Sequence, residues 1–498
     1  MTLAELATRL PGASLTGDGS LPVTAVTHDS RRAGPGIVFV AIRGLATDGN
    51  LFVEAARKKG AAAIVSEAPA LPGGAWLQVQ DAREALAVLA AAAQGDPARA
   101  LTLVGVTGTN GKTTTTHLVD AALRAAGHKV GLVGTIQYRV GDRLAEAART
   151  TPEASDLQEL FREMVDAGCD HAVMEVSSHS LVLKRVHGLA FRVAVFTNLT
   201  RDHLDFHGDM DAYFAAKRVL FDTLLRENGH AIVNAADDRA AALRASSRGT
   251  VWTFGIGEET GADLCATDVS LSLGGTRFRA RTPVGELVVE LPLLGRFNVE
   301  NLLGALGAAL ALGLPAAAVL RGLQSVTGVP GRLERVAAGQ DFAVIVDYAH
   351  TDDALKNLLE TVRELRPRRI ITVFGCGGDR DRTKRPLMGA VASRSSDVVV
   401  VTSDNPRSED PEAIIADILA GIPGYASGNG HGREDIAVEP DRRAAIAIAL
   451  AEAEPGDTVV IAGKGHEQGQ EFEGGRKIPF DDRAVAAELL GEAAGRPR

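Results

Sequence analysis

The sequence is poor in cysteine and has no long apolar run. Its 498 residues include three cysteines, Cys169, Cys265 and Cys376, which lie far apart and form no C-x-x-C pair. This pattern argues against a disulfide framework and against a zinc site built on cysteines, and it fits a reducing cytosol. No apolar run reaches the ~18–20 residues that span a bilayer, and residues 1–15 lack a basic segment. We therefore expect a cytoplasmic protein with no membrane insertion.

The chain also lacks an excess of basic residues. Its 53 lysines and arginines are outnumbered by 63 acidic residues, which gives a net charge of −10. This balance argues against nucleic acid as a partner, so any polyanionic ligand must be bound by local groups. An apolar content of 45% with 23% charged residues is typical of a globular protein. A chain of 498 residues predicts about three domains, with a monomer as the default expectation.

The pattern of apolar residues separates three blocks, residues 1–97, 98–330 and 331–498. The first has short strands and an alanine-rich helix over 82–94, which ends before Gly-Asp-Pro. In the other two blocks, buried strands such as LTLVGVTG, HAVMEVSS and DVVVVTSD alternate with helical patterns. Such alternation predicts an α/β fold of mostly parallel sheets covered by helices, with a Rossmann-like C-terminal domain.

Two segments depart from this alternation. Residues 263–294 alternate polar and apolar side chains, which predicts antiparallel strands that form an insertion or extend the central sheet. The glycine-rich run over 424–434 predicts a surface loop.

A glycine-rich loop lies between the first strand of the central block and the helix that follows it. There, backbone N–H groups and the helix dipole can hold a nucleotide triphosphate. Val106 replaces the first glycine of the strict P-loop pattern, but Lys112 is placed to reach the β- and γ-phosphates and Thr113 to bind Mg²⁺. The expected ATP-binding segment comprises Gly108, Thr109, Asn110, Gly111, Lys112, Thr113 and Thr114.

Ligand-forming side chains follow two further strands of this block. Glu175 ends the strand HAVME, and the next strand is followed by TNLTRDHLDFH, which contains His203. Because ligands in open α/β sheets bind at the carboxyl ends of strands, these side chains are candidates for a site. Alone, Glu175 could equally pair with a neighbouring lysine. Together, Glu175 and His203 suit an Mg²⁺ ion near Thr113.

Several longer motifs occur in a fixed order along the whole chain. They are GTNGKTT, EVSSH, TNLTRDHLDFHG, GRFNVENLLGA, GRLE, VDYAHT, GCGGDRDRTKRPLMG, SDNPR and GKGHE. This ordered set resembles the Mur ligases, and within them the branch that extends a muramoyl-dipeptide by a third residue. The resemblance implies three domains: the first binds the UDP end of UDP-N-acetylmuramoyl-L-alanyl-D-glutamate, the second is a P-loop domain that binds ATP, and the third brings the amino acid.

The resemblance also implies roles for single residues. Lys217 matches a lysine that is carbamylated in the family and would bind Mg²⁺ with Glu175 and His203, although without the resemblance it is typical of a surface helix lysine. Leu183 stands where family members often have a polar residue. The positions that match the UDP-muramoyl-peptide site are His28, Ser30, Leu45, Ala46, Thr47, Thr150, Thr151, Ser177, Leu183 and Arg185.

The remaining matches concern the nucleotide and the incoming amino acid. Asn298 and Asn301 match residues that contact the nucleotide, and Arg332 and Asp347 match residues of the third domain that close over the γ-phosphate and ribose. With Lys112, Glu175, His203 and Lys217, Arg332 completes the expected catalytic set. The amino-acid pocket is expected to comprise Arg385, Asp404, Asn405, Pro406, Arg407, Gly463 and Glu467.

The implied activity is an ATP- and Mg²⁺-dependent ligation through an acyl phosphate, as a step of peptidoglycan precursor synthesis. The planar fork of Arg407 suits the distal carboxylate of meso-2,6-diaminopimelate, whereas lysine or ornithine would present a like charge. Arg407 could instead pair with Glu467 or a nearby aspartate, which would leave lysine or ornithine as the substrate. A folylpolyglutamate synthase-like ligase is a further alternative, against which the DNPR and GKGHE segments argue. A non-catalytic nucleotide-binding module would not explain the second polar cluster at Glu175, His203 and Lys217.

Overall fold

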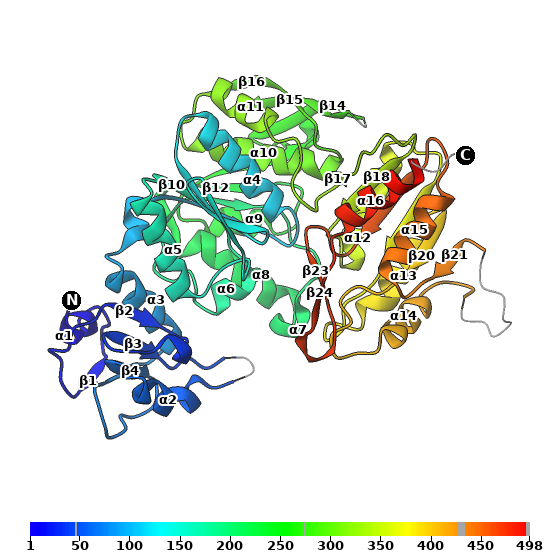
Figure 1. The fold of residues 1–498 in the computed structure, drawn as a ribbon. Coiled ribbons are helices and arrows are strands. Elements are labelled where there is room, and N and C mark those ends of the chain that lie inside the picture. The colour runs from blue at the N-terminus through cyan, green and yellow to red at the C-terminus, as the bar shows by residue number, and fades with distance from the viewer. Residues whose placement is uncertain (45–46, 273, 426–433, 495–498) are drawn as a thin grey trace.

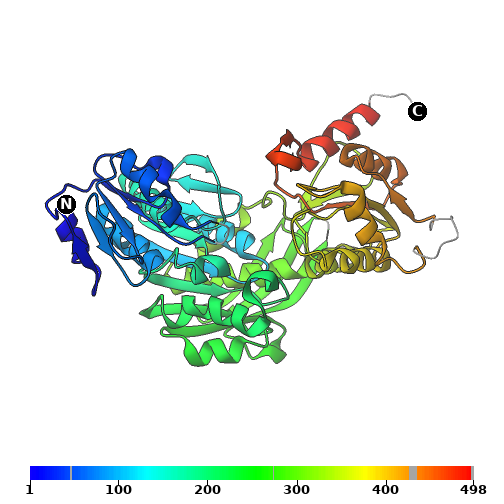
Figure 2. The same cartoon turned by 90° about the horizontal axis from the view of Figure 1, so that it is seen from below.

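The computed structural model describes residues 1–44, 47–272, 274–425 and 434–494, and each of its three parts is built around its own sheet. In Figures 1 and 2 the first part (blue) and the third part (yellow to red) lie on opposite sides of the central part. Each sheet falls within one of the three expected blocks, and the α/β class is confirmed. None of the helices in the described part of the chain is long and apolar enough to span a bilayer.

The first part contains a five-stranded sheet in the order β1-β5-β4-β3-β2, parallel except for β1. Helix α3 begins where Asp81 accepts the Glu84 N–H at 2.9 Å, and it buries Leu86 and Leu89. The elements are α1 (Leu3–Ala7), β1 (Ser14–Thr16), β2 (Ala25–Thr27), η1 (Ser30–Arg32), β3 (Ile37–Val40), η2 (Gly49–Phe52), α2 (Val53–Lys58), β4 (Ala63–Ser66), β5 (Trp76–Gln78), α3 (Ala82–Ala93) and η3 (Pro97–Ala100).

The central part contains an 11-stranded sheet in the order β16-β15-β14-β13-β12-β11-β6-β10-β7-β8-β9. Its elements are β6 (Thr102–Thr107), α4 (Lys112–Ala125), β7 (Val130–Val133), β8 (Gln137–Val140), β9 (Arg143–Glu146), α5 (Ala154–Asp166), β10 (His171–Glu175), α6 (Ser178–Val182), β11 (Phe191–Phe196), α7 (Leu204–His207), α8 (Met210–Asp222), β12 (Leu225–Asn234), α9 (Ala240–Ser246), β13 (Thr250–Ile256), η4 (Glu258–Thr260), β14 (Leu264–Ser272), β15 (Gly275–Thr282), β16 (Gly285–Leu291), α10 (Arg296–Ala311) and α11 (Ala316–Gln324).

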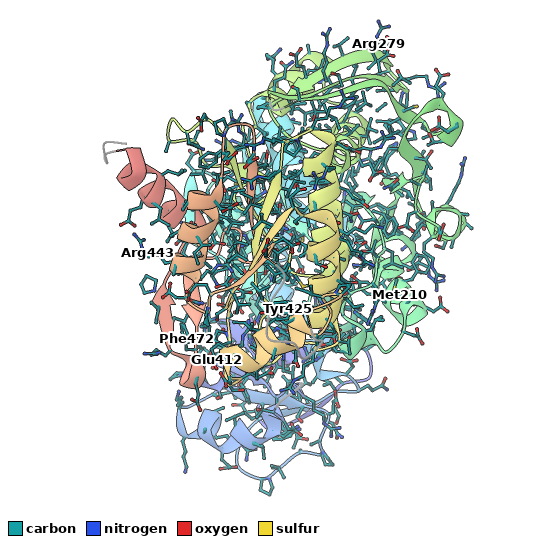
Figure 3. All side chains as sticks on the ribbon, turned by 90° about the vertical axis from the view of Figure 1, so that its right-hand side faces the viewer. Met210, Arg279, Glu412, Tyr425, Arg443 and Phe472 are labelled. Carbon is teal, nitrogen blue, oxygen red and sulfur yellow. The ribbon has the colours of Figure 1, made fainter. Side chains whose placement is uncertain are left out.

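Helices cover both faces of this sheet, because its middle strands are parallel and apolar on both sides. Helices α4, α10 and α11 form one core with it, and α5, α6 and α8 form the other. The antiparallel strands expected over 263–294 are confirmed as β14, β15 and β16, which extend the same sheet. Figure 3 shows Arg279 of β15 at the opposite end of the molecule from the first part. The hairpin β8–β9 at the other edge was not expected, since its strands are short and carry charged residues.

The third part contains a six-stranded sheet in the order β17-β18-β22-β19-β20-β21, parallel except for β17. Most of the glycine-rich run predicted as a loop, residues 426–433, lies outside the described residues. The elements are β17 (Glu334–Arg335), β18 (Ala343–Asp347), α12 (Asp352–Glu364), β19 (Ile370–Phe374), α13 (Lys384–Ser395), β20 (Val398–Val401), α14 (Pro411–Leu419), β21 (Ile436–Val438), α15 (Arg442–Glu452), β22 (Thr458–Ala462), β23 (Gly469–Glu471), η5 (Glu473–Gly475), β24 (Lys477–Pro479) and α16 (Asp482–Ala494).

A fully buried ion pair fastens the last helix to this part. Arg442 of α15 donates from Nε and Nη2 to the Asp482 carboxylate at 2.8 and 2.7 Å, and Nη2 also donates to the Ala462 carbonyl at 3.0 Å. Both side chains are 0% exposed. Because the guanidinium has left water, it depends on these acceptors.

We expect Asp482→Ala to destabilise the protein by about 3–5 kcal/mol, because it leaves a buried guanidinium without its anion. Glu488→Ala is the matched control: it removes the exposed partner of the adjacent Arg443, and about 0–1 kcal/mol is expected there. Urea unfolding followed by circular dichroism measures both. Equal losses in the two variants would contradict the assigned role of the buried pair.

Candidate active site

The loop between β6 and α4 has the geometry of a phosphate site. The N–H of Thr115 donates to Gly111 O at 2.9 Å within α4. The N–H groups of Lys112, Thr113 and Thr114 precede it, so they have no acceptor within the helix. They lie at the positive end of the helix dipole, which favours an anion. The expected strand–loop–helix arrangement is therefore present.

Two glycines allow this loop to lie against its neighbours. At Gly108, with φ 151°, a Cβ atom would lie 1.9 Å from Thr197 Oγ1, and at Gly111, with φ 85°, it would lie 2.2 Å from Asn301 Oδ1. The Asn110 N–H donates to Asn198 Oδ1 at 2.9 Å, which fixes the loop. Asn198 belongs to the expected group of ligand-forming side chains directly after β11, although the sequence did not predict its contact with the phosphate loop.

Lys112 and Lys217 both lie against this loop. Lys112 Nζ donates to the Gly108 and Thr109 carbonyls at 3.0 and 2.8 Å, and Lys217 Nζ donates to the Gly108 carbonyl at 2.8 Å. Lys217 is 1% exposed, and its Nζ lies 4.4 Å from the centre of the Tyr213 ring. Burial, reinforced by the charge of Lys112, holds the pKa of Lys217 well below its usual range. Lys217 is thus not the surface helix lysine that its local sequence suggests.

Glu175 connects the phosphate loop to a second strand end. It ends β10 with 0% exposure, and its Oε1 accepts from the Thr113 hydroxyl at 3.0 Å and the Thr135 N–H at 2.8 Å. The Thr135 hydroxyl lies 3.1 Å from Glu175 Oε2 and 3.0 Å from Thr150 Oγ1. Thr135 was missed from the sequence, although it follows β7 at the same sheet edge. Glu175 and Thr113 together offer the hard oxygen donors that Mg²⁺ binds.

His203 lies at the start of α7 with a positive φ of 53°. Its imidazole lies 4.8 Å from the ring of His179 and 3.3 Å from Asp202 Oδ1. Burial lowers the pKa of His203 to about 4, with the positive charges of Lys112 and Lys217 acting in the same direction. The ring is therefore neutral at pH 7 and can act as a metal ligand. The backbone N–H of His203 donates to Asp202 Oδ1 at 2.8 Å, and among the described residues no hydrogen bond joins His203 to Glu175.

The third part contributes Arg332 to this loop. Its Nη2 lies 3.4 Å from Thr113 Oγ1, and its guanidinium lies 4.8 Å from the centre of the Tyr348 ring. Its Nε is buried, and none of the described residues gives it a hydrogen-bond acceptor. Asp347, at the end of β18, accepts the N–H groups of Leu333 and Ala349, both at 2.8 Å, which orients the segment that carries Arg332.

A cavity of about 720 Å³ lies between the central and third parts, beside the phosphate loop. It is lined by Gly111, Thr113, Asn301, Arg332 and Asp347, and also by Met210, which Figure 3 labels on the central part. Asn298 lies buried beneath the lining, where its Oδ1 accepts from Asn301 Nδ2 at 3.0 Å. Of the expected nucleotide residues, seven line this cavity, namely Asn110, Gly111, Thr113, Thr114, Asn301, Arg332 and Asp347, whereas Gly108, Thr109, Lys112 and Asn298 lie outside its lining.

The residues expected to hold the muramoyl-peptide lie beside Glu175. Thr151 donates to the Glu175 carbonyl at 2.8 Å and lies 3.3 Å from Ser177 Oγ. Arg185 donates to the Thr151 carbonyl at 3.1 Å and forms an ion pair with Glu153 at 2.7 Å. Leu183 is the residue directly after helix α6, and its carbonyl accepts from Arg83 Nη1 at 3.5 Å.

The residues expected at the uridine end belong to the first part. His28 Nδ1 lies 2.9 Å from Ser155 Oγ of α5, which connects the first part to the central one. Ser30 begins the short helix η1, and the carbonyl of Thr47 accepts the Gly44 N–H at 2.9 Å. Leu45 and Ala46 lie outside the described residues.

The expected amino-acid pocket is organised around Lys464. This buried lysine lies 2.8 Å from Asn405 Oδ1, 3.1 Å from Glu467 Oε2 and 3.3 Å from Asp404 Oδ1. A Cβ atom on Gly463, with φ 118°, would lie 3.8 Å from the Asp404 carboxylate. Lys464 was missed from the sequence, although it stands within GKGHE.

The two arginines of the expected amino-acid pocket, Arg385 and Arg407, both pair with acidic side chains of this chain. Arg407 donates from Nε to Glu471 Oε2 at 3.2 Å and from Nη1 to the Gly378 carbonyl at 2.6 Å. Its partner is thus Glu471, not the Glu467 considered from the sequence. Arg385 is buried and donates to Glu409 and to Asp417.

The Pro406 carbonyl accepts the Glu409 N–H at 3.0 Å. The same carbonyl lies close to Gly378, where an added Cβ atom would be 1.8 Å from the Pro406 oxygen. Pro406 therefore sets the path of the backbone between Asn405 and Arg407, where Arg407 has a positive φ of 53°.

Comparisons with known proteins agree with this arrangement. Residues 22–94 match the catalytic domain of the Mur ligase family, residues 106–309 the Mur ligase middle domain, and residues 331–465 the Mur ligase glutamate ligase domain. These three matches fall on the three parts of the structure.

Full-length relatives show the same family. The chain is 50% identical over 473 residues to the UDP-N-acetylmuramoyl-L-alanyl-D-glutamate--2,6-diaminopimelate ligase of Solibacter usitatus, covering 94% of this chain and 93% of that one. It is 46% identical over 497 residues to the ligase of the same name from Geobacillus thermodenitrificans, covering 99% and 100%. A solved structure of such a ligase superposes with a TM-score of 0.70 at 34% identity, covering 100% of both chains. The chain therefore belongs to the Mur ligase family of ATP-dependent, amide-bond-forming ligases.

Proposed function

We propose that this ligase adds meso-2,6-diaminopimelate to UDP-N-acetylmuramoyl-L-alanyl-D-glutamate, in the cytoplasm, as a step of peptidoglycan precursor synthesis. The observation that carries the proposal is that Arg332 of the third part and Thr113 of the phosphate loop meet at one cavity between the central and third parts, while the buried Glu175 accepts from the Thr113 hydroxyl. The proposed domain boundaries, after residues 97 and 330, leave each sheet within one domain. The relatives that cover nearly the whole chain carry the name of this activity.

The reaction has two steps. The γ-carboxylate of D-glutamate attacks the γ-phosphorus of ATP, so that an acyl phosphate forms and ADP leaves. The amino group of the incoming amino acid then attacks the acyl carbon, loses its proton, and phosphate leaves as the amide bond forms. Lys112 and Arg332 lie where they can neutralise charge on the phosphoryl oxygens.

The buried oxygen donors beside the phosphate loop fit Mg²⁺. When bound, Mg²⁺ neutralises charge on the phosphate oxygens and orients them. Thr113 and Glu175 offer oxygen atoms, and His203 offers a neutral imidazole. Lys217 would complete the set as a carbamate, which forms when a neutral amine adds to carbon dioxide and releases a proton. The depressed pKa of Lys217 supports this modification, because a larger fraction of the amine is then neutral and able to add to carbon dioxide.

The choice of amino acid depends on the pocket of the third part. Arg407 offers a planar fork for a carboxylate, and Asp404 and Glu467 are acidic groups suited to an ammonium. Diaminopimelate carries both groups at its distal end, whereas lysine and ornithine carry the ammonium alone. Substrate binding exchanges the Glu471 partner of Arg407 for the distal carboxylate. Lysine or ornithine remains the alternative substrate. Binding of either would leave the Arg407–Glu471 pair intact.

We expect Lys217→Ala to lower the ligation rate by about 10²-fold or more, because it removes a group that contacts the phosphate loop and would bind Mg²⁺ as a carbamate. A small carboxylate such as acetate should restore part of the rate. Ligation by the unmodified protein should also fall as the pH is lowered, since protonation of the amine opposes carbamate formation. Phosphate release with all substrates present measures each effect.

The matched control for Lys217 is Arg218→Ala, which changes the next residue of α8, whose side chain pairs with Asp222. It should retain nearly full activity. Full activity in Lys217→Ala would exclude the proposed metal role.

We expect kcat/KM for diaminopimelate to exceed that for lysine or ornithine by at least about tenfold, because a like charge would face Arg407. Arg407→Ala should lower the diaminopimelate value by about 10- to 100-fold, the loss of a charged hydrogen bond. Arg476→Ala is the control: this exposed arginine stacks on Phe472 of the neighbouring hairpin. A tenfold preference of the unmodified protein for lysine or ornithine would show that the assignment of Arg407 is wrong.

A further inference from the structure

Two histidines and an aspartate cluster at the edge of the central sheet opposite to the active site. His128 lies in the turn between α4 and β7, while Asp170 and His171 lie at the start of β10. Because β7 and β10 are parallel neighbours, both segments meet at the same edge, with His171 opposite Val130. Glu175 ends the same strand β10, about 13 Å away at 3.3 Å per residue. The cluster is therefore separate from the phosphate loop.

The three side chains point their ligand atoms toward one another. His128 Nδ1 lies 2.7 Å from Asp170 Oδ2, and His171 Nδ1 lies 3.1 Å from Asp170 Oδ1. The two rings are 4.2 Å apart between their centres, and all three ligand atoms lie within 4.8 Å of one another. Ligands of a tetrahedral ion at about 2.05 Å are roughly 3.3 Å apart, so small side-chain rotations reach that geometry.

One of these ligand atoms, His171 Nδ1, is left without a well-formed hydrogen bond to the described residues. His171 is 9% exposed, and within the described part of the chain its buried Nδ1 has no hydrogen bond of good geometry, although it lies 3.1 Å from Asp170 Oδ1. Buried polar atoms are rarely left unpaired, so an orphaned imidazole nitrogen facing a carboxylate marks a place for a ligand. Burial also lowers the pKa of His171, which keeps its ring neutral and able to donate a lone pair.

The backbone around the cluster is held in place. The Asp170 N–H donates to the Lys129 carbonyl at 3.0 Å, and the Thr102 N–H donates to the Asp170 carbonyl at 2.9 Å. The Lys129 N–H donates to Asp170 Oδ1 at 3.1 Å, which orients the carboxylate. Ligands that are orientated by such hydrogen bonds favour metal binding.

We propose that His128, Asp170 and His171 form a binding site for a divalent transition-metal ion, with Zn²⁺ as the best match. Two imidazoles and one carboxylate are a donor set that Zn²⁺ accepts, with water in the fourth position. Magnesium prefers oxygen ligands and does not compete well for this set. The bound ion joins the turn after α4 to the start of β10, the two elements that carry Lys112 and Glu175 at their other ends. Its role is therefore to stabilise the scaffold and not to take part in ligation.

Zinc titration of the full-length, tag-free protein tests this site. The protein is treated with a chelator, returned to buffer with excess Mg²⁺, and titrated with Zn²⁺ against a chromogenic chelator. We expect about one equivalent to bind, with an affinity that falls by on the order of tenfold or more in His171→Gln and in Asp170→Asn. Zn²⁺ should also raise the thermal unfolding midpoint of the unmodified protein but not of these variants.

The control His187→Gln changes a histidine that has a single carboxylate neighbour, Glu84 at 3.5 Å, and it should bind Zn²⁺ as the unmodified protein does. His128→Gln, at a half-buried turn position, provides a variant in which folding is least affected. Ligation with Mg²⁺ should be unchanged in His128→Gln, since the site lies at the other sheet edge. Equal zinc affinity in all variants, or no zinc uptake by the unmodified protein, would overturn the proposal.

Discussion

A buried carboxylate at the end of a parallel strand is the constraint on which the rest of the active site depends. Glu175 has 0% exposure, and a carboxylate removed from water is stable only where donors surround it. The Thr113 hydroxyl and the Thr135 N–H meet this need. Because these donors come from the start of α4 and the end of β7, satisfying one anion also fixes the phosphate loop and a third strand end relative to each other.

Desolvation then sets the charge of the basic groups around this anion. Burial lowers the pKa values of Lys112, Lys217 and His203, and mutual repulsion between the lysines reinforces the effect for Lys217. A cluster of basic groups of this kind favours an incoming polyanion, whose negative charge offsets the repulsion between them. The same physical effect operates at His171 on the opposite sheet edge, where burial again favours the neutral ring.

The third part completes the site through groups that the central part lacks. Arg332 reaches Thr113, and Asp353 Oδ2 lies 3.4 Å from the Asn110 amide of the phosphate loop. These contacts are long and polar, so each adds little stability by itself. The cavity between the parts is therefore lined on one side by Gly111 and Thr113 of the phosphate loop and on the other by Arg332, Asp347 and Tyr348 of the third part.

The sequence by itself determined the α/β class, the phosphate loop, the antiparallel strands over 263–294 and the position of Glu175 at a strand end. These features depend on local periodicity, turn residues and spacing, which can be identified from the sequence alone. Only the tertiary structure decided that Lys217 is buried, that Thr135 binds Glu175, that Glu471 pairs with Arg407, and that Lys464 joins Asp404 to Glu467. Each of these depends on which residues meet across the fold, and on the loss of water there, neither of which a local pattern specifies.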